Sequence, residues 1–224
     1  MDSDKFLNIN DSVALESLMT ALKSENAILF VGAGCSARLG LPSWTSLLKD
    51  LVDLHGDLEL DQYKIKNDII KYAGEVKRKL FEKNDNSHSR YENYLSRRFK
   101  NPEDGYLENT ELHDLIVQWP VKSYITTNYD KAIEYFLRKE DQNIEGICVK
   151  NKPMLGKYLF NLKEDKLRHE VLHLHGIYTD AKSIVLSDDV SRYKVWGNYC
   201  FTAGHKNLKL FVDCSLAKEW LSEQ

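Results

Sequence analysis

The sequence predicts an α/β fold in which a parallel sheet carries helices on both faces. Short apolar runs alternate with segments of helical periodicity, and the first apolar run ends in a glycine-rich turn. Residues Ala27–Val31 are all apolar and stop at Gly32, which is the pattern of a strand buried on both faces. Strands that alternate with helices in this way predict a parallel sheet between two helical layers.

The remaining elements follow from the same patterns in chain order. Apolar residues at helical spacing predict helices at 12–23, 44–54, 131–139, 188–196 and 216–221. Short apolar runs predict strands at 123–126, 146–149, 171–175 and 208–212, and residues 183–186 are expected to be extended. Ser187 is a plausible N-cap for the helix that follows it.

Residues 57–119 differ in texture from the rest of the chain. They are rich in Lys, Asn, Asp, Glu and Tyr, with helical periodicity and no convincing strand. We expect a helical insertion within a single domain that spans 1–224. Basic clusters at 77–79 and 97–100 could hold phosphates, but acidic residues are interspersed, which favours a solvated helix face.

Composition excludes several classes of protein. The 224 residues are 42% hydrophobic and 29% charged with a net charge of −3, so no membrane or nucleic-acid partner is expected. The four cysteines, at 35, 148, 200 and 214, lack zinc-site spacing and suggest no disulfide framework, which predicts a metal-free cytoplasmic protein. The acidic N-terminus lacks the apolar run of a signal peptide.

The glycine-rich turn carries the first chemistry. Gly32-x-Gly34-x-x-Ala37 follows a predicted strand and precedes a helix, which is the context of a dinucleotide fingerprint on a Rossmann-like fold. Glycines allow the backbone to approach a pyrophosphate, although such a turn can also be purely structural. The acidic residue expected after the second strand has no candidate, because Asp50 and Asp53 fall inside a helix, and this disfavours an ordinary dehydrogenase.

Four motifs in order resemble those of the sirtuins. Gly32-Ala33-Gly34-Cys35-Ser36, followed by Gly40-Leu41-Pro42-Ser43-Trp44, is similar to the sirtuin Gly-Ala-Gly-x-Ser and Gly-Ile-Pro-Asp-Phe. Thr127-Asn128-Tyr129-Asp130 resembles Gln-Asn-Ile-Asp, and His175-Gly176 resembles the sirtuin His-Gly. Asp213-Cys214-Ser215-Leu216 stands where the family has Gly-x-Ser-Leu, so that the resemblance covers about residues 26–217.

The departures from the pattern indicate the subfamily. The chain lacks the paired cysteines of the sirtuin zinc module and the Phe-Gly-Glu segment that binds acyl-lysine peptides. Asp213 replaces a glycine beside the adenosine site. What remains resembles the zinc-free NADases of bacterial anti-phage defence. The resemblance implies NAD⁺ as the substrate, nicotinamide and ADP-ribose as products, and no metal.

The implied chemistry needs few residues. Nicotinamide leaves NAD⁺ as a neutral group, so no general acid is required, and the transition state is oxocarbenium-like. By resemblance, Asn128 positions the ribose hydroxyl or the attacking water, Asp130 binds the carboxamide, and His175 is the general base. The resemblance also implies contacts to NAD⁺ from Gly32, Ala33, Gly34, Ser36, Trp44, Thr127 and Ser215.

Each of these roles has a structural alternative. Asn128 could simply cap the helix that begins near Asp130. His173 and His175 alternate with leucines and are expected on one face of a strand, where either could be a core histidine. We assign function to His175 and a core position to His173.

Two other functions stay open beside the NADase. A protein deacylase or ADP-ribosyltransferase would need an acceptor-peptide groove, which the sequence does not reveal. A non-catalytic module that binds NAD⁺ or ADP-ribose is opposed by the presence of both Asn128 and His175. An NADase must be held off in its own cell, so we expect a separate sensor protein in a hetero-oligomer, contacted through the insertion or the helix around Trp220.

Overall fold

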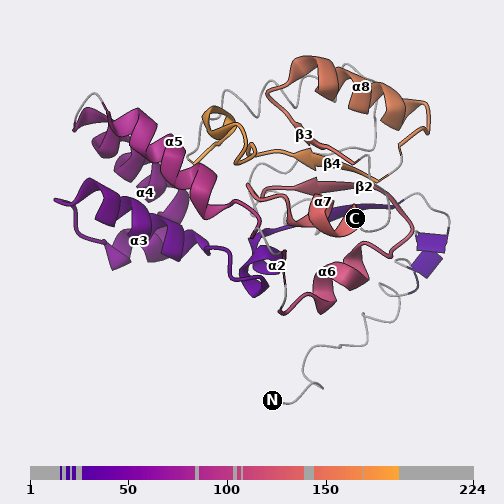
Figure 1. The fold of residues 1–224 in the computed structure, drawn as a ribbon, viewed down its shortest axis with the longest axis horizontal. Coiled ribbons are helices and arrows are strands. Elements are labelled where there is room, and N and C mark those ends of the chain that lie inside the picture. Colours follow the sequence, from indigo (N-terminus) through magenta and orange to yellow (C-terminus); the bar gives the residue numbers. More distant parts are fainter. Residues whose placement is uncertain are drawn as a thin grey trace, which may run out of the picture.

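The computed structural model describes residues 16, 19–20, 22–23, 27–83, 86–102, 105–106, 108–138, 144–167 and 169–186. The predicted elements at 188–196, 208–212 and 216–221 lie outside the described residues, as do Ser187, Asp213, Ser215 and Trp220. The described elements (Figure 1) are β1 (Ala27–Val31), α2 (Ala33–Arg38), α3 (Trp44–His55), α4 (Gln62–Glu82), α5 (Ser87–Arg98), α6 (Glu111–Ile116), β2 (Val121–Thr126), α7 (Ala132–Leu137), β3 (Gly146–Cys148), α8 (Lys152–Lys163), β4 (Glu170–His173) and the 3₁₀ helix η2 (Ala181–Ser183).

A parallel sheet forms the centre of the fold. Its four described strands run in the order β1-β2-β4-β3 and every pair is parallel. In this register Tyr124 lies beside Val171 and Ile125 beside Leu172. The predicted parallel sheet is therefore confirmed, and β3 reaches its place beside β4 by a crossover.

Helices cover both faces of this sheet. Tyr124 and Val171 pack in one hydrophobic cluster with side chains of α6 and α7, namely Ile116, Ile133 and Phe136. Leu172 belongs to a second cluster, which contains side chains of α8, namely Leu155, Tyr158 and Leu159. Because successive strand residues point to opposite faces, α8 lies on the face opposite to α6 and α7. The prediction of a Rossmann-like α/β fold is confirmed.

Strand β1 is less buried than its apolar sequence predicts. Among its five residues only Val31 is fully buried, and the Phe30 side chain is 60% exposed. The reason is position: β1 is an edge strand of the described sheet, and α8 packs over β3 and β4 at the other side. The prediction that this strand is buried on both faces is wrong for the described residues.

Helix α8 was not predicted from the sequence, although local signals specify it. The side chain of Asn151 accepts a hydrogen bond from the Met154 amide at 3.3 Å, and Pro153 stands in the first turn, where its missing N–H costs nothing. Leu155, Tyr158 and Leu159 recur at helical spacing and are buried. The capping residue and this spacing are the signals that could have predicted the helix.

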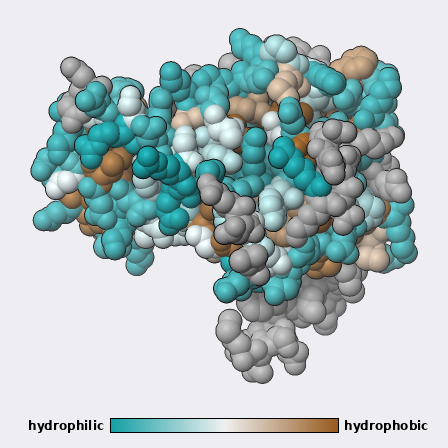
Figure 2. All heavy atoms as spheres, viewed as in Figure 1, coloured by the Kyte–Doolittle hydropathy of each residue, from teal (hydrophilic) through white to brown (hydrophobic). Residues whose placement is uncertain are grey.

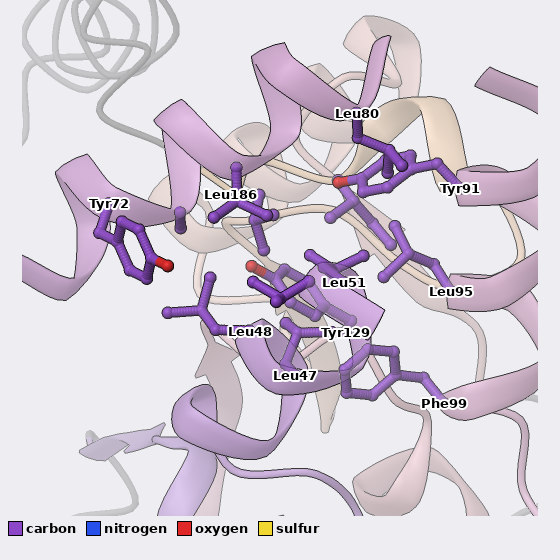
Figure 3. Packing of buried hydrophobic residues seen from close by; sticks show 14 residues of the cluster. Leu47, Leu48, Leu51, Tyr72, Leu80, Tyr91, Leu95, Phe99, Tyr129 and Leu186 are labelled. Atoms are coloured by element: carbon purple, nitrogen blue, oxygen red, sulfur yellow. The ribbon is translucent and has the colours of Figure 1, made fainter. Parts of the chain in front are cut away.

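Helices α3, α4 and α5 form a helical unit beside the sheet (Figure 1). Helix α3 begins at an N-cap serine, since the Ser43 hydroxyl accepts from the Ser46 amide at 3.2 Å, and it ends at Gly56 with φ 87°. The three helices share a hydrophobic cluster in which their leucine and aromatic side chains point toward one another (Figure 3). Tyr129 and Leu186, from outside the unit, complete that cluster.

The residues of the predicted insertion lie in two places. Helices α4 and α5 belong to the helical unit, whereas α6 packs against α7 and the sheet. The single-domain division with an insertion at 57–119 stays a prediction.

The described surface is mainly hydrophilic on the face seen in Figure 2. Hydrophobic side chains appear there as small separate patches among polar ones. Within the described part of the chain, no helix combines the length and the hydropathy needed to cross a bilayer.

Candidate functional site

A pocket lies where β1 and β2 end. Residues that directly follow these two strands line it, together with residues of α3 and the residue that ends α5. In parallel α/β sheets, small-molecule sites typically lie beyond the carboxyl ends of the strands. The lining residues are Ala33, Ser36, Pro42, Trp44, Leu47, Phe99, Thr127, Asn128, Tyr129 and Asp130. The structure thus brings together six of the residues that the sequence singled out.

The glycines of the first turn leave open space at this end of the sheet. Gly32 is the N-cap of α2, and Gly34 lies in its first turn. Apart from their own chain neighbours, no atom of the described residues lies within 4 Å of a Cβ atom placed on either glycine. Packing among the described residues therefore does not require glycine at either position.

Asn128 is held at four points. Its backbone N–H donates to the Thr126 hydroxyl at 3.0 Å, and its backbone carbonyl accepts from the His173 ring at 2.9 Å. Its side-chain Nδ2 donates to the Gly32 carbonyl at 3.1 Å and to the Ser36 hydroxyl at 2.7 Å. The Gly32 carbonyl can only accept a hydrogen bond, so the side-chain amide of Asn128 must present its nitrogen, and not its oxygen, to Gly32. Its Oδ1 is then left buried with no hydrogen-bond partner among the described residues.

Asp130 is a buried carboxyl group beside this asparagine. Its Oδ1 accepts from the Ala132 amide at 3.0 Å, at the start of α7. Burial raises the pKa of Asp130, and hydrogen bonds from the Ala132 amide and the Ser36 side chain oppose that rise. Ser36 therefore links the side chains of Asn128 and Asp130, and all three line the pocket.

The helical unit supplies the apolar wall of the pocket. Trp44 and Leu47 come from α3, and Phe99 caps the end of α5. The Phe99 ring meets the ring of Tyr129 edge-to-face, with centroids 5.2 Å apart, and both lie in the cluster of Figure 3. Sequence analysis missed Phe99. Within 57–119 it was one aromatic residue among many, and only the packing of α5 against the 127–130 loop brings it to the site.

His175 lies beyond the strand in which it was predicted. Strand β4 ends at His173, and the chain then runs alongside the residues that follow β2. The Leu174 amide donates to the Thr126 carbonyl and the Tyr178 amide to the Tyr129 carbonyl, both at 2.8 Å. The expectation that both histidines share one strand face is therefore wrong, because the ladder stops between them.

The structure also explains the glycine of the His-Gly pair. Gly176 has φ 93°, and a Cβ atom there would collide with the backbone of Ser183 and Ile184. His175 itself is only partly buried and is not among the residues that line the pocket. Burial of its ring lowers the pKa of His175 to about 4, so the imidazole is neutral at physiological pH.

His173 is a core histidine, as the sequence analysis assigned it. Its side chain is fully buried, with Nε2 2.8 Å from a carboxylate oxygen of Glu134 on α7. Burial alone would lower the pKa of His173, but the Glu134 carboxylate and the Asn128 carbonyl outweigh it and the pKa is raised.

Two further expectations concern the rest of the site. Ser215, expected at the adenosine side, lies outside the described residues. Among the residues that the structure describes, no three His, Cys, Asp or Glu side chains gather in an arrangement that could hold a metal ion.

Known proteins share sequence similarity with this chain in the region that contains these motifs. Residues 122–223 match the family model of the SIR2-like domain. This part of the chain is therefore similar to a SIR2-like domain. This matched segment contains the Asn128 loop and the His175-Gly176 pair.

Curated relatives match over a larger part of the chain. It is 30% identical to the NAD(+) hydrolase ThsA of Cytobacillus dafuensis over 87% of its length, and 30% identical to that of Enterococcus faecium over 83%. The ThsA protein of Bacillus cereus is 28% identical over 76% of the chain. These matches cover 35%, 35% and 32% of the relatives, so the chain spans about a third of their length.

Proposed function

We propose that this protein hydrolyses NAD⁺ to nicotinamide and ADP-ribose, as the effector of a bacterial anti-phage defence. The Oδ1 atom of Asn128 carries the proposal. It is a buried acceptor without a partner on a residue that lines the pocket, and every other polar atom of Asn128 is held by the protein. A buried unpaired acceptor is costly, and the donor hydroxyl of a ribose or of a water molecule would satisfy it.

The other residues of the site divide the remaining tasks. The open space at Gly32 and Gly34, with Ala33 and Ser36, accepts the phosphate and ribose part of the dinucleotide. Trp44 and Thr127 flank the nicotinamide end, where the carboxyl group of Asp130 binds the carboxamide. Ser215 contacts the adenosine part.

His175 accepts the proton of the attacking water or ribose hydroxyl. Its lowered pKa keeps the imidazole neutral, which is the form that can accept a proton. No general acid is needed because nicotinamide leaves as a neutral molecule, and the chemistry needs no metal ion.

The proposed function is tested by measuring the release of nicotinamide from NAD⁺ by the purified protein, alone and with an acylated lysine peptide. Release that is independent of the peptide supports hydrolysis. Release that requires the peptide would assign a deacylase or ADP-ribosyltransferase instead. NAD⁺ that binds measurably but stays intact, with every partner tried, would reject the NADase.

A non-catalytic module that binds NAD⁺ or ADP-ribose is the second candidate. It is favoured by one observation, since His175 does not line the described pocket and a base with a pKa of about 4 is weak. The same experiment separates the two, because the module would bind NAD⁺ without releasing nicotinamide.

Regulation and location complete the proposal. An unrestrained NADase would exhaust the NAD⁺ of its own cytoplasm, so we infer that a separate sensor subunit controls this one in a hetero-oligomer. We infer that it contacts this chain through the insertion at 57–119 or the segment around Trp220. Purification of the native complex, followed by NAD⁺ turnover with and without the second subunit, tests this part.

A further inference from the structure

The buried pair of His173 and Glu134 plays no part in the chemistry above, yet it contacts the central residue of the site. The two side chains are 0% and 1% exposed and come from β4 and α7. A buried charged pair is rarely the most stable way to fill a core, since apolar side chains of similar volume often serve as well or better. Its presence at this position suggests a task other than stability.

The hydrogen bonds of the pair show what it holds. The Asn128 carbonyl can only accept, so His173 Nδ1 carries a proton and donates it at 2.9 Å. At the other side of the ring Nε2 lies 2.8 Å from Glu134 Oε1. Glu134 thus orients the ring, and the ring fixes the peptide group of Asn128.

The neighbouring strand is shaped around the pair. A Cβ atom on Gly146 of β3 would collide with Glu134 Oε1 and come within 3.0 Å of His173 Nε2. The φ of Gly146 is not positive, so backbone conformation alone does not require glycine here. Glycine is required because a side chain at this position would occupy the space of His173 and Glu134.

We propose that His173, oriented by Glu134, is a positioning residue that fixes the backbone of Asn128 and thereby aims its free Oδ1 at the substrate. The proposal rests on the function proposed above. His173 touches no substrate and acts only through Asn128. Without the hydrogen bond from His173 Nδ1, Asn128 loses one of the four contacts that fix it, the one at its backbone carbonyl.

Two substitutions separate positioning from packing. The amide of His173→Asn overlaps the Nδ1 position and can still donate to the Asn128 carbonyl, whereas that of His173→Gln overlaps Nε2 and keeps only the contact with the side chain at position 134. Both are made in a Glu134→Gln background, so that neither leaves a buried unpaired charge. We expect the His173→Gln protein to lose about 10–100-fold in kcat with little change in KM, which is the loss typical when a partner that orients a metal-binding histidine is removed. The His173→Asn protein should keep most of its kcat at a similar thermal midpoint.

A control comes from another buried polar contact on the same strands. The Ser123 hydroxyl donates to the Glu170 carbonyl at 2.7 Å and lies 3.0 Å from the Tyr158 hydroxyl, at the far ends of β2 and β4. Ser123→Ala should lower the thermal midpoint and leave kcat unchanged. Equal loss of kcat in the His173→Asn and His173→Gln proteins, in proportion to their stability, would overturn the proposal.

A second readout does not depend on turnover. In protein labelled with ¹⁵N-asparagine, the Asn128 side-chain amide is assigned by its absence in Asn128→Ala. Its signals should shift in the His173→Gln protein and stay close to wild type in the His173→Asn protein. If the wild type releases no nicotinamide while the variants show this pattern of shifts, the NADase is refuted and the positioning role is kept. Signals that stay unmoved in both variants would refute that role.

Discussion

At the scale of single residues, the site depends on atoms whose hydrogen bonds are nearly all made within the protein. Thr126 donates its hydroxyl to the Val31 carbonyl at 2.8 Å and accepts from the Asn128 amide, which ties the ends of β1 and β2 together. Asn128 is therefore oriented before any ligand arrives. Such preorganisation lowers the cost of reaching the productive geometry when the substrate binds.

The lowered pKa of His175 gives a prediction about pH. The ring Cε1–H signal of His175, assigned by its loss in His175→Asn, should not titrate between pH 8 and about 5.5 and should shift only near pH 4. The unfolded chain binds this proton near pH 6.5, so the folded state loses stability as the pH falls from about 6.5 to about 4. The His175→Asn protein should lose less stability over that window. A midpoint near 6.5 in the folded protein would contradict the burial of this ring.

The sequence predicted most of the residues that meet at the pocket, because short motifs at strand ends carry local geometry. Asn128, Asp130, Ser36 and Trp44 all follow strands or begin helices that periodicity could predict. It did not predict Phe99 or Glu134. Both make their contacts with residues that are distant in sequence, and no local pattern distinguishes either from other residues in or next to its helix.

At the scale of elements, the pocket is built where the helical unit meets the sheet. Helix α3 carries Trp44 and Leu47 to the pocket, and its buried face holds it against α4 and α5. The positions of the apolar wall residues should therefore depend on the packing of this helical unit. Helix α8 packs on the opposite face of the sheet and contributes no residue to the pocket.

Two matched leucine truncations test this dependence. Leu51 of α3 and Leu155 of α8 are 0% and 1% exposed, so Leu51→Ala and Leu155→Ala should each cost about 2–5 kcal/mol of unfolding free energy. Only Leu51→Ala should also weaken NAD⁺ affinity, because α3 carries wall residues and α8 carries none. Urea unfolding and calorimetric titration with NAD⁺ measure both quantities. An equal loss of affinity in the two proteins would show that the wall does not depend on the helical unit.

The element boundaries show where sequence patterns fail. Strand β4 was predicted to reach His175, because alternation of leucine and histidine continues past the point where pairing stops. Helix α8 was missed, although Asn151 and the spacing of its leucines predict it in hindsight. Phe30 is exposed because the place of β1 in the sheet, which depends on long-range pairing, decides its burial.

At the scale of the whole molecule, we expect folding and activity to be independent of a metal ion. The sequence has no cysteine pair with zinc-site spacing, and the proposed chemistry gives no task to a metal ion. Treatment with EDTA should therefore change neither the thermal midpoint nor the rate of NAD⁺ hydrolysis. Stoichiometric zinc in the purified protein, or unfolding by the chelator, would contradict this expectation.

The proposed function requires two residues, Asn128 in the pocket at the ends of β1 and β2, and His175 beyond the end of β4. It is tested by the rate of nicotinamide release from NAD⁺ by wild-type protein, Asn128→Ala and His175→Ala, with circular dichroism as the control for folding. We expect release by the wild type and a loss of about 10²–10⁴-fold in each folded variant. Wild-type turnover in either variant, or turnover lost in His173→Ala but kept in His175→Ala, would contradict the account.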